Sequence, residues 1–197
     1  HMTATPIPRT LAVTAYGGMD LSVIDELPPG RTPVTTRHIA PGKVPGMYEF
    51  IRKQAARGFQ TYYVCPLIEE SERIDVASVT RHHAVLSAGP FAALRTGLLH
   101  GHMKPCEKDA VMEQVRRGEV DVLFSTTVIE VGLDCPSATV MVIEDAFRFG
   151  LTQLHQLRGR IGRGSIASYC VLLYRPPLSA AAHARLRILR QEHSGFV

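Results

Sequence analysis

The chain has 197 residues, 45% of them hydrophobic, and a formal net charge of +4. This composition is typical of one globular domain, and no apolar run is long enough to span a bilayer. Its four cysteines are widely spaced and form no C-x-x-C pair, which disfavours a zinc centre or a disulfide framework and suits a reducing cytosol. Arginine supplies most of the basic charge, as expected for a phosphate-rich partner.

The first residues of the chain, up to a connector at residues 27–33, are expected to precede the main domain. Pro6 and Pro8 forbid a continuing helix and predict a stiff turn rich in hydroxyl groups. A short helix is expected at residues 10–16, before a rigid polar connector at residues 27–33. We therefore place the domain boundary near Pro28.

From residue 34 onward, short apolar strands alternate with amphipathic helices. Strands are predicted at residues 34–39, 61–65, 97–100, 120–124, 139–143 and 169–174. Helices are predicted at residues 44–57, 74–86, 105–117 and 178–191, with a short helical turn at 91–95. Gly58 is placed to end the first helix. Such alternation indicates an α/β fold with a parallel sheet and helices on both faces.

Ligands of parallel sheets bind beyond the carboxyl ends of the strands. Four unusual segments are expected at that edge: residues 66–70, 101–104, 125–136 and 153–164. The last of these, called the arginine segment here, holds Arg158, Arg160 and Arg163 among glycines.

Arginine presents a planar fork of donors that matches phosphate oxygens. Helical spacing places Gln153, Gln156 and Arg160 on one side of a helix, with Arg163 near its end, the position of an arginine finger. A solvated basic helix end is the alternative.

Two further segments carry possible ligand contacts. Thr126 and Thr127 could bind nucleic-acid phosphates, Gly132 permits close backbone approach, and Asp134 could accept a ribose hydroxyl. The alternative is a solvated loop with a helix N-cap. His100 and Gly101 offer similar donors, with a plain strand-to-helix turn as the alternative. A metal site with His82 and His83 is disfavoured, because no acidic or cysteine ligand shares a suitable spacing.

The chain has no G-x-x-x-x-G-K-[ST] loop, and no strand is expected to end in an acidic pair placed to hold Mg²⁺. Arginines suited to a nucleoside triphosphate thus occur without a phosphate cradle. The economical explanation places the cradle on another lobe.

The order of these segments resembles superfamily 2 helicases. Residues 3–9 resemble motif III, 62–71 motif IV, 100–103 motif IVa, 125–136 motif V and 153–164 motif VI. Within the superfamily, the connector and motif IV resemble the branch that remodels stalled replication forks and Holliday junctions in recombination and repair. The branch that couples transcription to repair differs in both.

The resemblance implies a three-layer RecA-like domain of the P-loop NTPase type at residues 31–175. Residues 1–30 would be motif III and a connector, and 176–197 the start of a helical hairpin. The whole enzyme would be an ATP-dependent DNA helicase of the bacterial cytoplasm, associated with the nucleoid. ATP and Mg²⁺ would be bound mainly by a missing first lobe, a wedge domain would grip branched DNA, and the fragment alone would be inactive. A non-catalytic DNA-binding module and a transcription-coupled translocase lobe are the alternatives.

The resemblance also implies residue roles. Arg160 and Arg163 would face the γ-phosphate, oriented by Gln156, while Gly132 and Asp134 contact the nucleotide. DNA-backbone contacts would come from His100, Gly101, Thr126 and Thr127. Thr3 and Thr5 would couple the two lobes.

Overall fold

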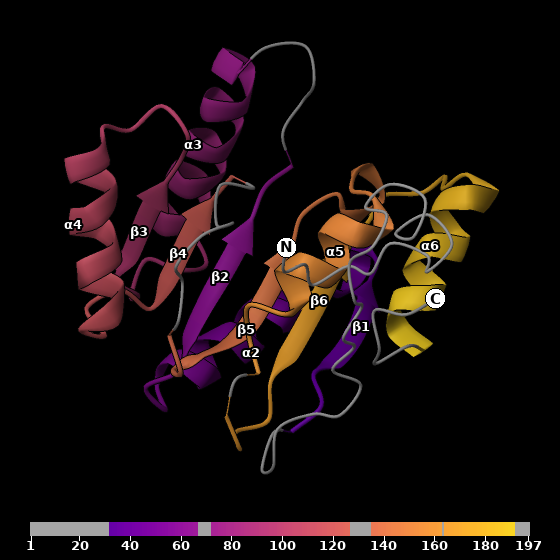
Figure 1. The fold of residues 1–197 in the computed structure, drawn as a ribbon, viewed down its shortest axis with the longest axis horizontal. Coiled ribbons are helices and arrows are strands. Elements are labelled where there is room, and N and C mark those ends of the chain that lie inside the picture. Colours follow the sequence, from indigo (N-terminus) through magenta and orange to yellow (C-terminus); the bar gives the residue numbers. More distant parts are fainter. Residues whose placement is uncertain (1–31, 67–71, 127–134, 163, 192–197) are drawn as a thin grey trace, which may run out of the picture.

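The computed structural model describes residues 32–66, 72–126, 135–162 and 164–191. Its centre is a parallel six-stranded sheet in the order β1-β6-β5-β2-β4-β3 (Figure 1). The strands are β1 (Thr35–Ile39), β2 (Gln60–Val64), β3 (Thr96–Leu99), β4 (Val122–Ser125), β5 (Ala138–Ile143) and β6 (Tyr169–Leu173). Every predicted strand is present, so the predicted α/β class with a parallel sheet is confirmed.

Helices cover both faces of the sheet, as expected. One layer holds α2 (Val44–Ala55) and α3 (Glu72–Ala88); the other holds α4 (Pro105–Arg116), α5 (Leu151–Arg158) and α6 (Ala180–Gln191) (Figure 1). Two short 3-10 helices, η1 (Pro41–Lys43) and η2 (Ala146–Arg148), complete the order.

Two apolar clusters hold these layers together, one on each face. Along β5, Val140 and Val142 pack toward α2 and α3, whereas Met141 and Ile143 pack toward α5 and α6. All six residues of β5 are buried. This explains why the strand reads as a continuous apolar run instead of an alternating one.

The element boundaries differ from the predicted ones by a few residues. Residues 91–95 form turns and no helix. The last helix begins at Ala180, because the Ser179 hydroxyl accepts a hydrogen bond from the Ala182 amide at 3.2 Å and caps the first turn. Gly58 has φ +81° just after α2, as its predicted place at the helix end requires. The expected helix at residues 10–16 and the boundary near Pro28 lie outside the described residues.

Within the described ranges, no helix is long and apolar enough to cross a membrane. Three cysteines, Cys65, Cys135 and Cys170, are buried, whereas Cys106 is exposed. All four are unpaired thiols.

Candidate functional site

The carboxyl edge of the sheet brings together two of the predicted segments. His100 follows β3 and Thr126 follows β4, and the Thr126 amide donates to the Leu99 carbonyl at 3.3 Å. Gly101 is exposed and His100 is partly exposed, but Thr126 is only 1% exposed. Thr127 lies outside the described residues. This edge therefore presents His100 and Gly101 at its surface, with Thr126 beneath it.

Three buried polar atoms beside the ends of β3 and β4 lack hydrogen-bond partners within the described part of the chain: the hydroxyls of Ser125 and Thr126 and Nδ1 of His100. Burial, followed by the positive charges of His102 and Lys108, lowers the pKa of His100, while Glu107 opposes this. Lys108 Nζ donates to the Gly101 carbonyl at 2.7 Å. The edge thus combines unmet hydrogen-bonding capacity with a local surplus of basic groups.

The arginine segment forms α5 and the turn after it. The Gly150 amide donates to Oε1 of Gln153 at 3.0 Å, so Gln153 caps the start of the helix. Gln156 is exposed on α5, and Arg160 is partly exposed just beyond the helix end. Arg163 lies outside the described residues. The structure thus keeps Gln156 and Arg160 accessible, while Gln153 is engaged locally.

Arg158 differs from Arg160 in its surroundings. It is 7% exposed, and Nη1 donates to the Leu189 carbonyl of α6 at 2.9 Å. Nη2 lies 3.1 Å from Nδ1 of His155. Burial lowers the pKa of the Arg158 guanidinium, yet arginine stays charged near neutral pH. This arginine joins α5 to α6 and is unavailable to a ligand.

The arginine segment does not share the carboxyl edge, and that part of the prediction is wrong. The Gly164 carbonyl accepts a hydrogen bond from the Thr32 amide at 3.3 Å, and Gly162 lies against Val34 and Ser168. These partners precede β1 and β6, at the amino edge of the sheet. The reason is topological, because a crossover helix between parallel strands carries the chain back from the carboxyl edge to the amino edge.

A different convergence occurs at the amino edge. Cys135, at the end of the predicted motif V, belongs to the same apolar cluster as Leu157 and Ile161 of the arginine segment. The two predicted nucleotide-contacting segments therefore contribute to one apolar cluster on the face of the sheet that α5 covers. Gly132 and Asp134, as well as Thr3 and Thr5, lie outside the described residues.

An acidic pair escaped the sequence analysis. β5 runs directly into Glu144 and Asp145, an acidic pair that the expectation about Mg²⁺ did not consider. The signal was visible, since both acids follow the apolar run at residues 139–143.

Both carboxylates of this pair are engaged by other side chains. The Tyr63 hydroxyl donates to Oε2 of Glu144 at 2.5 Å, and Arg175 lies 3.6 Å from Glu144 and 3.3 Å from Asp145. Burial and the Glu144 carboxylate raise the pKa of Tyr63 well above its usual range, which keeps its phenol a donor.

Glu144 faces the side of the sheet opposite the arginine segment. Glu144 lines a pocket of about 790 Å³ together with Tyr48 of α2 and with Arg81 and His82 of α3. These helices cover the face opposite α5. The described residues contain no group of three or more metal-ligating side chains. The pair is therefore a structural link between β2, β5 and the chain after β6.

Comparisons with known proteins agree with this geometry. Residues 42–165 match the family model described as the helicase conserved C-terminal domain. The ATP-dependent DNA helicase RecG of Escherichia coli O157:H7 is 53% identical over 197 residues, and that of Synechocystis is 51% identical over 195. The chain covers 100% and 99% of its own length in these matches, but only 28% and 23% of the relatives.

Solved structures give the same picture. A structure of RecG bound to a three-way DNA junction matches with a TM-score of 0.82 and 46% identity, covering 98% of this chain and 25% of that one. Saccharomyces cerevisiae Dbp5 bound to RNA and ADP BeF3 matches at 0.56 with 13% identity, covering 93% and 45%, which shows the fold alone. RecG is the branch of superfamily 2 that the connector and motif IV resemble, so that resemblance and the RecA-like architecture are confirmed.

Proposed function

Because the chain belongs to the family of helicase conserved C-terminal domains, we propose that it is the second motor lobe of an ATP-dependent DNA helicase of the RecG type. The observation that carries this proposal is that the motif V end and the arginine segment both reach the amino edge of the sheet and contribute to one apolar cluster there. The chain spans about a quarter of its curated relatives, so the activity belongs to a longer protein.

The nucleotide would bind in a cleft between this lobe and a first lobe. Arg160 and Arg163 would face the γ-phosphate, with Gln156 setting their orientation and with Gly132 and Asp134 on the nucleoside side. Guanidinium N–H groups suit phosphate oxygens and cannot ligate Mg²⁺, and the chain has no G-x-x-x-x-G-K-[ST] loop to cradle the phosphates. The Mg²⁺ and the phosphate cradle would therefore come mainly from the first lobe. There, Mg²⁺ would neutralise charge on the transferring phosphoryl group.

DNA would be held at the opposite edge of the sheet. His100 and Gly101 are the surface candidates for phosphate contacts, supported by the basic charge of Lys108. Thr126 and Thr127 begin the segment that leads from this edge toward the nucleotide. Thr126, whose buried hydroxyl has no hydrogen-bond partner among the described residues, would support these contacts from beneath the surface.

Splitting the two contacts between edges suggests how the motor works. Closure of the lobes around ATP would bring Arg160 and Arg163 to the phosphate and complete the site. Hydrolysis would release that closure. Motif V begins at the DNA edge and ends at the nucleotide edge. It would therefore couple the closing and opening of the lobes to the contacts with DNA.

The wider assignment follows the RecG relatives. Residues 1–30 would be motif III and the connector, with Thr3 and Thr5 coupling the lobes, and 176–197 would begin a helical hairpin. The partners would be branched DNA and the first lobe and wedge domain of the same protein, in the bacterial cytoplasm at the nucleoid. We do not pursue the transcription-coupled lobe or the non-catalytic module, because the RecG relatives match across the whole chain.

The first experiment removes the cross-lobe arginines in the longer protein. Arg160→Ala and Arg163→Ala should each lower ATP turnover by about 10³-fold or more, because arginine fingers contribute on that scale. Binding to forked DNA should be unchanged, since Arg160 lies away from the DNA edge and both arginines are assigned to the nucleotide. Arg117→Ala, which removes an exposed arginine just after α4, is the matched control. Turnover near wild type in both finger variants would refute the nucleotide assignment.

A second experiment tests the half-site directly. This chain alone should hydrolyse no ATP, with or without forked DNA, and adding the first lobe should restore hydrolysis. Robust turnover by the chain alone would mean that it holds a complete nucleotide site, and the lobe assignment would fall.

A further inference from the structure

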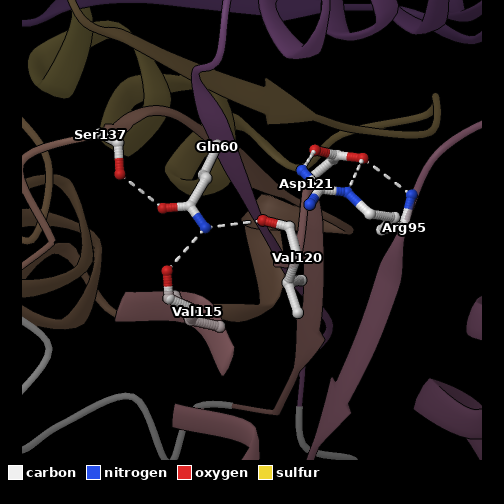
Figure 2. A network of polar contacts seen from close by, with 6 residues as sticks. All are labelled: Gln60, Arg95, Val115, Val120, Asp121 and Ser137. Carbon is white, nitrogen blue, oxygen red and sulfur yellow. Dashed lines mark hydrogen bonds and ion pairs between the residues drawn. The ribbon is translucent and has the colours of Figure 1, made fainter. Parts of the chain in front are cut away.

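The side chain of Gln60 joins three separate parts of the amino edge (Figure 2). It is buried at the start of β2, with only 4% of the residue exposed. Nε2 donates to the carbonyls of Val115 at 2.8 Å and Val120 at 2.6 Å. Oε1 accepts from the Ser137 hydroxyl at 2.6 Å and from the Cys135 thiol at 2.9 Å. All four hydrogen-bonding positions of the amide are therefore used.

The chemistry of the partners fixes the orientation of this amide. Backbone carbonyls can only accept, so the nitrogen must face Val115 and Val120. The oxygen must then face Ser137 and Cys135, and each of these donates its proton. No other residue type of this size offers two donors and two acceptors in one plane. Gln60 is thus a specific connector between the α4–β4 turn and the segment that precedes β5.

That segment is the end of motif V. The backbone N–H of Gln60 also donates to the Ser137 carbonyl at 2.8 Å. The register of β2 on β5 shifts between Gln60 and Thr61. Gln60 therefore holds Ser137 by main chain and by side chain at an irregular point of the sheet. Cys135 belongs to the same apolar cluster as Leu157 and Ile161 of the arginine segment, which flank residues 158–160 in sequence.

We propose that Gln60 is a positioning residue for ATP binding: its side-chain amide fixes residues 135–137 against the sheet and so sets the end of motif V on the face that carries the arginine segment. This inference rests on the proposed function. Gln60 itself touches no nucleotide. It would act by holding the backbone that follows the nucleotide-contacting part of motif V.

A neighbouring network supplies the control. Arg95 and Asp121 form a paired contact at the same edge, with Nη2 to Oδ1 at 2.5 Å and Nε to Oδ2 at 3.1 Å (Figure 2). The Arg95 amide also donates to Asp121 Oδ2 at 2.8 Å. This pair links β3 to β4, and the hydrogen bonds described for it do not reach residues 135–137. Its loss should loosen the edge without moving motif V.

The experiment compares three variants in the longer protein: Gln60→Met, Ser137→Ala and Arg95→Met. Gln60→Met removes the whole amide at similar volume. Ser137→Ala removes one of the four bonds of the amide, together with the 3.1 Å contact between the Ser137 hydroxyl and the Cys135 thiol. Both should raise the KM for ATP, by about tenfold for Gln60→Met, which is the scale of one well-formed hydrogen bond. The kcat at saturating ATP and the affinity for forked DNA should stay within about twofold of wild type. Arg95→Met should leave KM unchanged.

The outcomes are distinguishable. General destabilisation would lower the active fraction, and hence kcat, at constant KM. If Gln60→Met does not fold, Ser137→Ala decides, because it keeps both bonds to Val115 and Val120. An unchanged KM in the folded variants, with turnover still lost in Arg160→Ala, would overturn the role of Gln60 and leave the proposed function intact. Wild-type turnover in Arg160→Ala and Arg163→Ala would remove the proposed function and this inference with it.

Discussion

Arg158 and Arg160 stand two positions apart in the arginine segment but have different surroundings. The Arg158 guanidinium is buried between α5 and α6, where it donates to the Leu189 carbonyl. Arg158→Met should lower the free energy of unfolding by about 1.5–3 kcal/mol, because a hydrogen bond from a charged donor is lost and a buried carbonyl is left without it. Urea unfolding of the chain would measure this.

The control for that prediction is Arg117→Met. Arg117 is exposed and pairs with Glu113 at 2.9 Å, a surface contact that contributes little. Its free energy of unfolding should stay within about 0.5 kcal/mol of the wild-type value. Equal stability of Arg158→Met and wild type would show that the buried guanidinium does not join the two helices.

At the scale of elements, the turn from α5 to β6 depends on Gly162. Its φ is +70°, and a Cβ atom there would lie 2.5 Å from Cγ2 of Val34. Gly162→Ala should therefore destabilise the chain by about 1–3 kcal/mol. The causes are backbone strain at a positive φ and overlap of the new Cβ with the Val34 side chain, which directly precedes β1. Thermal unfolding would measure the change.

Two variants separate the causes of that effect. Gly164→Ala should be nearly neutral, because no atom lies within 4 Å of its added Cβ. Combining Gly162→Ala with Val34→Ala should remove the overlap but keep the backbone strain, so stability measured against Val34→Ala alone should recover only in part. A neutral Gly162→Ala would contradict the close approach of the turn to Val34.

The elements were predictable from sequence to the degree that they depend on local pattern. Short apolar runs fixed the six strands, and Gly58 and the proline at Pro105 marked helix ends correctly. The edge reached by the arginine segment follows from topology, since a crossover helix returns the chain to the amino edge, and the prediction missed it by treating the segment as a loop that follows a strand. The role of Gln60 was invisible, since its partners lie 55, 60 and 77 positions away.

At the scale of the whole molecule, the two ends of the sheet should be separable in function. His100→Ala combined with Thr127→Ala in the longer protein should weaken binding to forked DNA, while the KM for ATP measured at saturating DNA stays unchanged. Fluorescence anisotropy with labelled forks and steady-state ATP turnover would measure both. Loss of ATP binding with intact DNA binding would reverse our assignment of the two edges.

The histidines predict how stability depends on pH. Burial lowers the pKa of His83, His100 and His155 below the ordinary 6.5, helped at His155 by the Arg158 charge. Below about pH 6.5 the unfolded chain therefore binds protons that the folded chain does not, and the free energy of unfolding decreases as the pH is lowered. Above that pH both states are neutral and the contribution is complete.

This dependence can be measured by urea unfolding at pH 7.5, 6.5 and 5.5. The midpoint should fall toward pH 5.5, and the decline should be shallower in His83→Gln and His155→Gln. A midpoint that rises toward pH 5.5 would contradict the burial of these rings in their neutral form.

The pairing of β1 with β6 bears on how such a chain emerges during synthesis. Thr32 and its hydrogen-bond partner Ser165 are separated by 133 positions, so the first strand of the sheet adjoins the last. At roughly 5–20 residues per second, a ribosome would need roughly 7–27 s to supply that partner. Until then, β5 also lacks its β6 neighbour, and both strands have unpaired backbone edges. Nascent chains stalled before residue 165 should therefore be the species that a chaperone captures most readily.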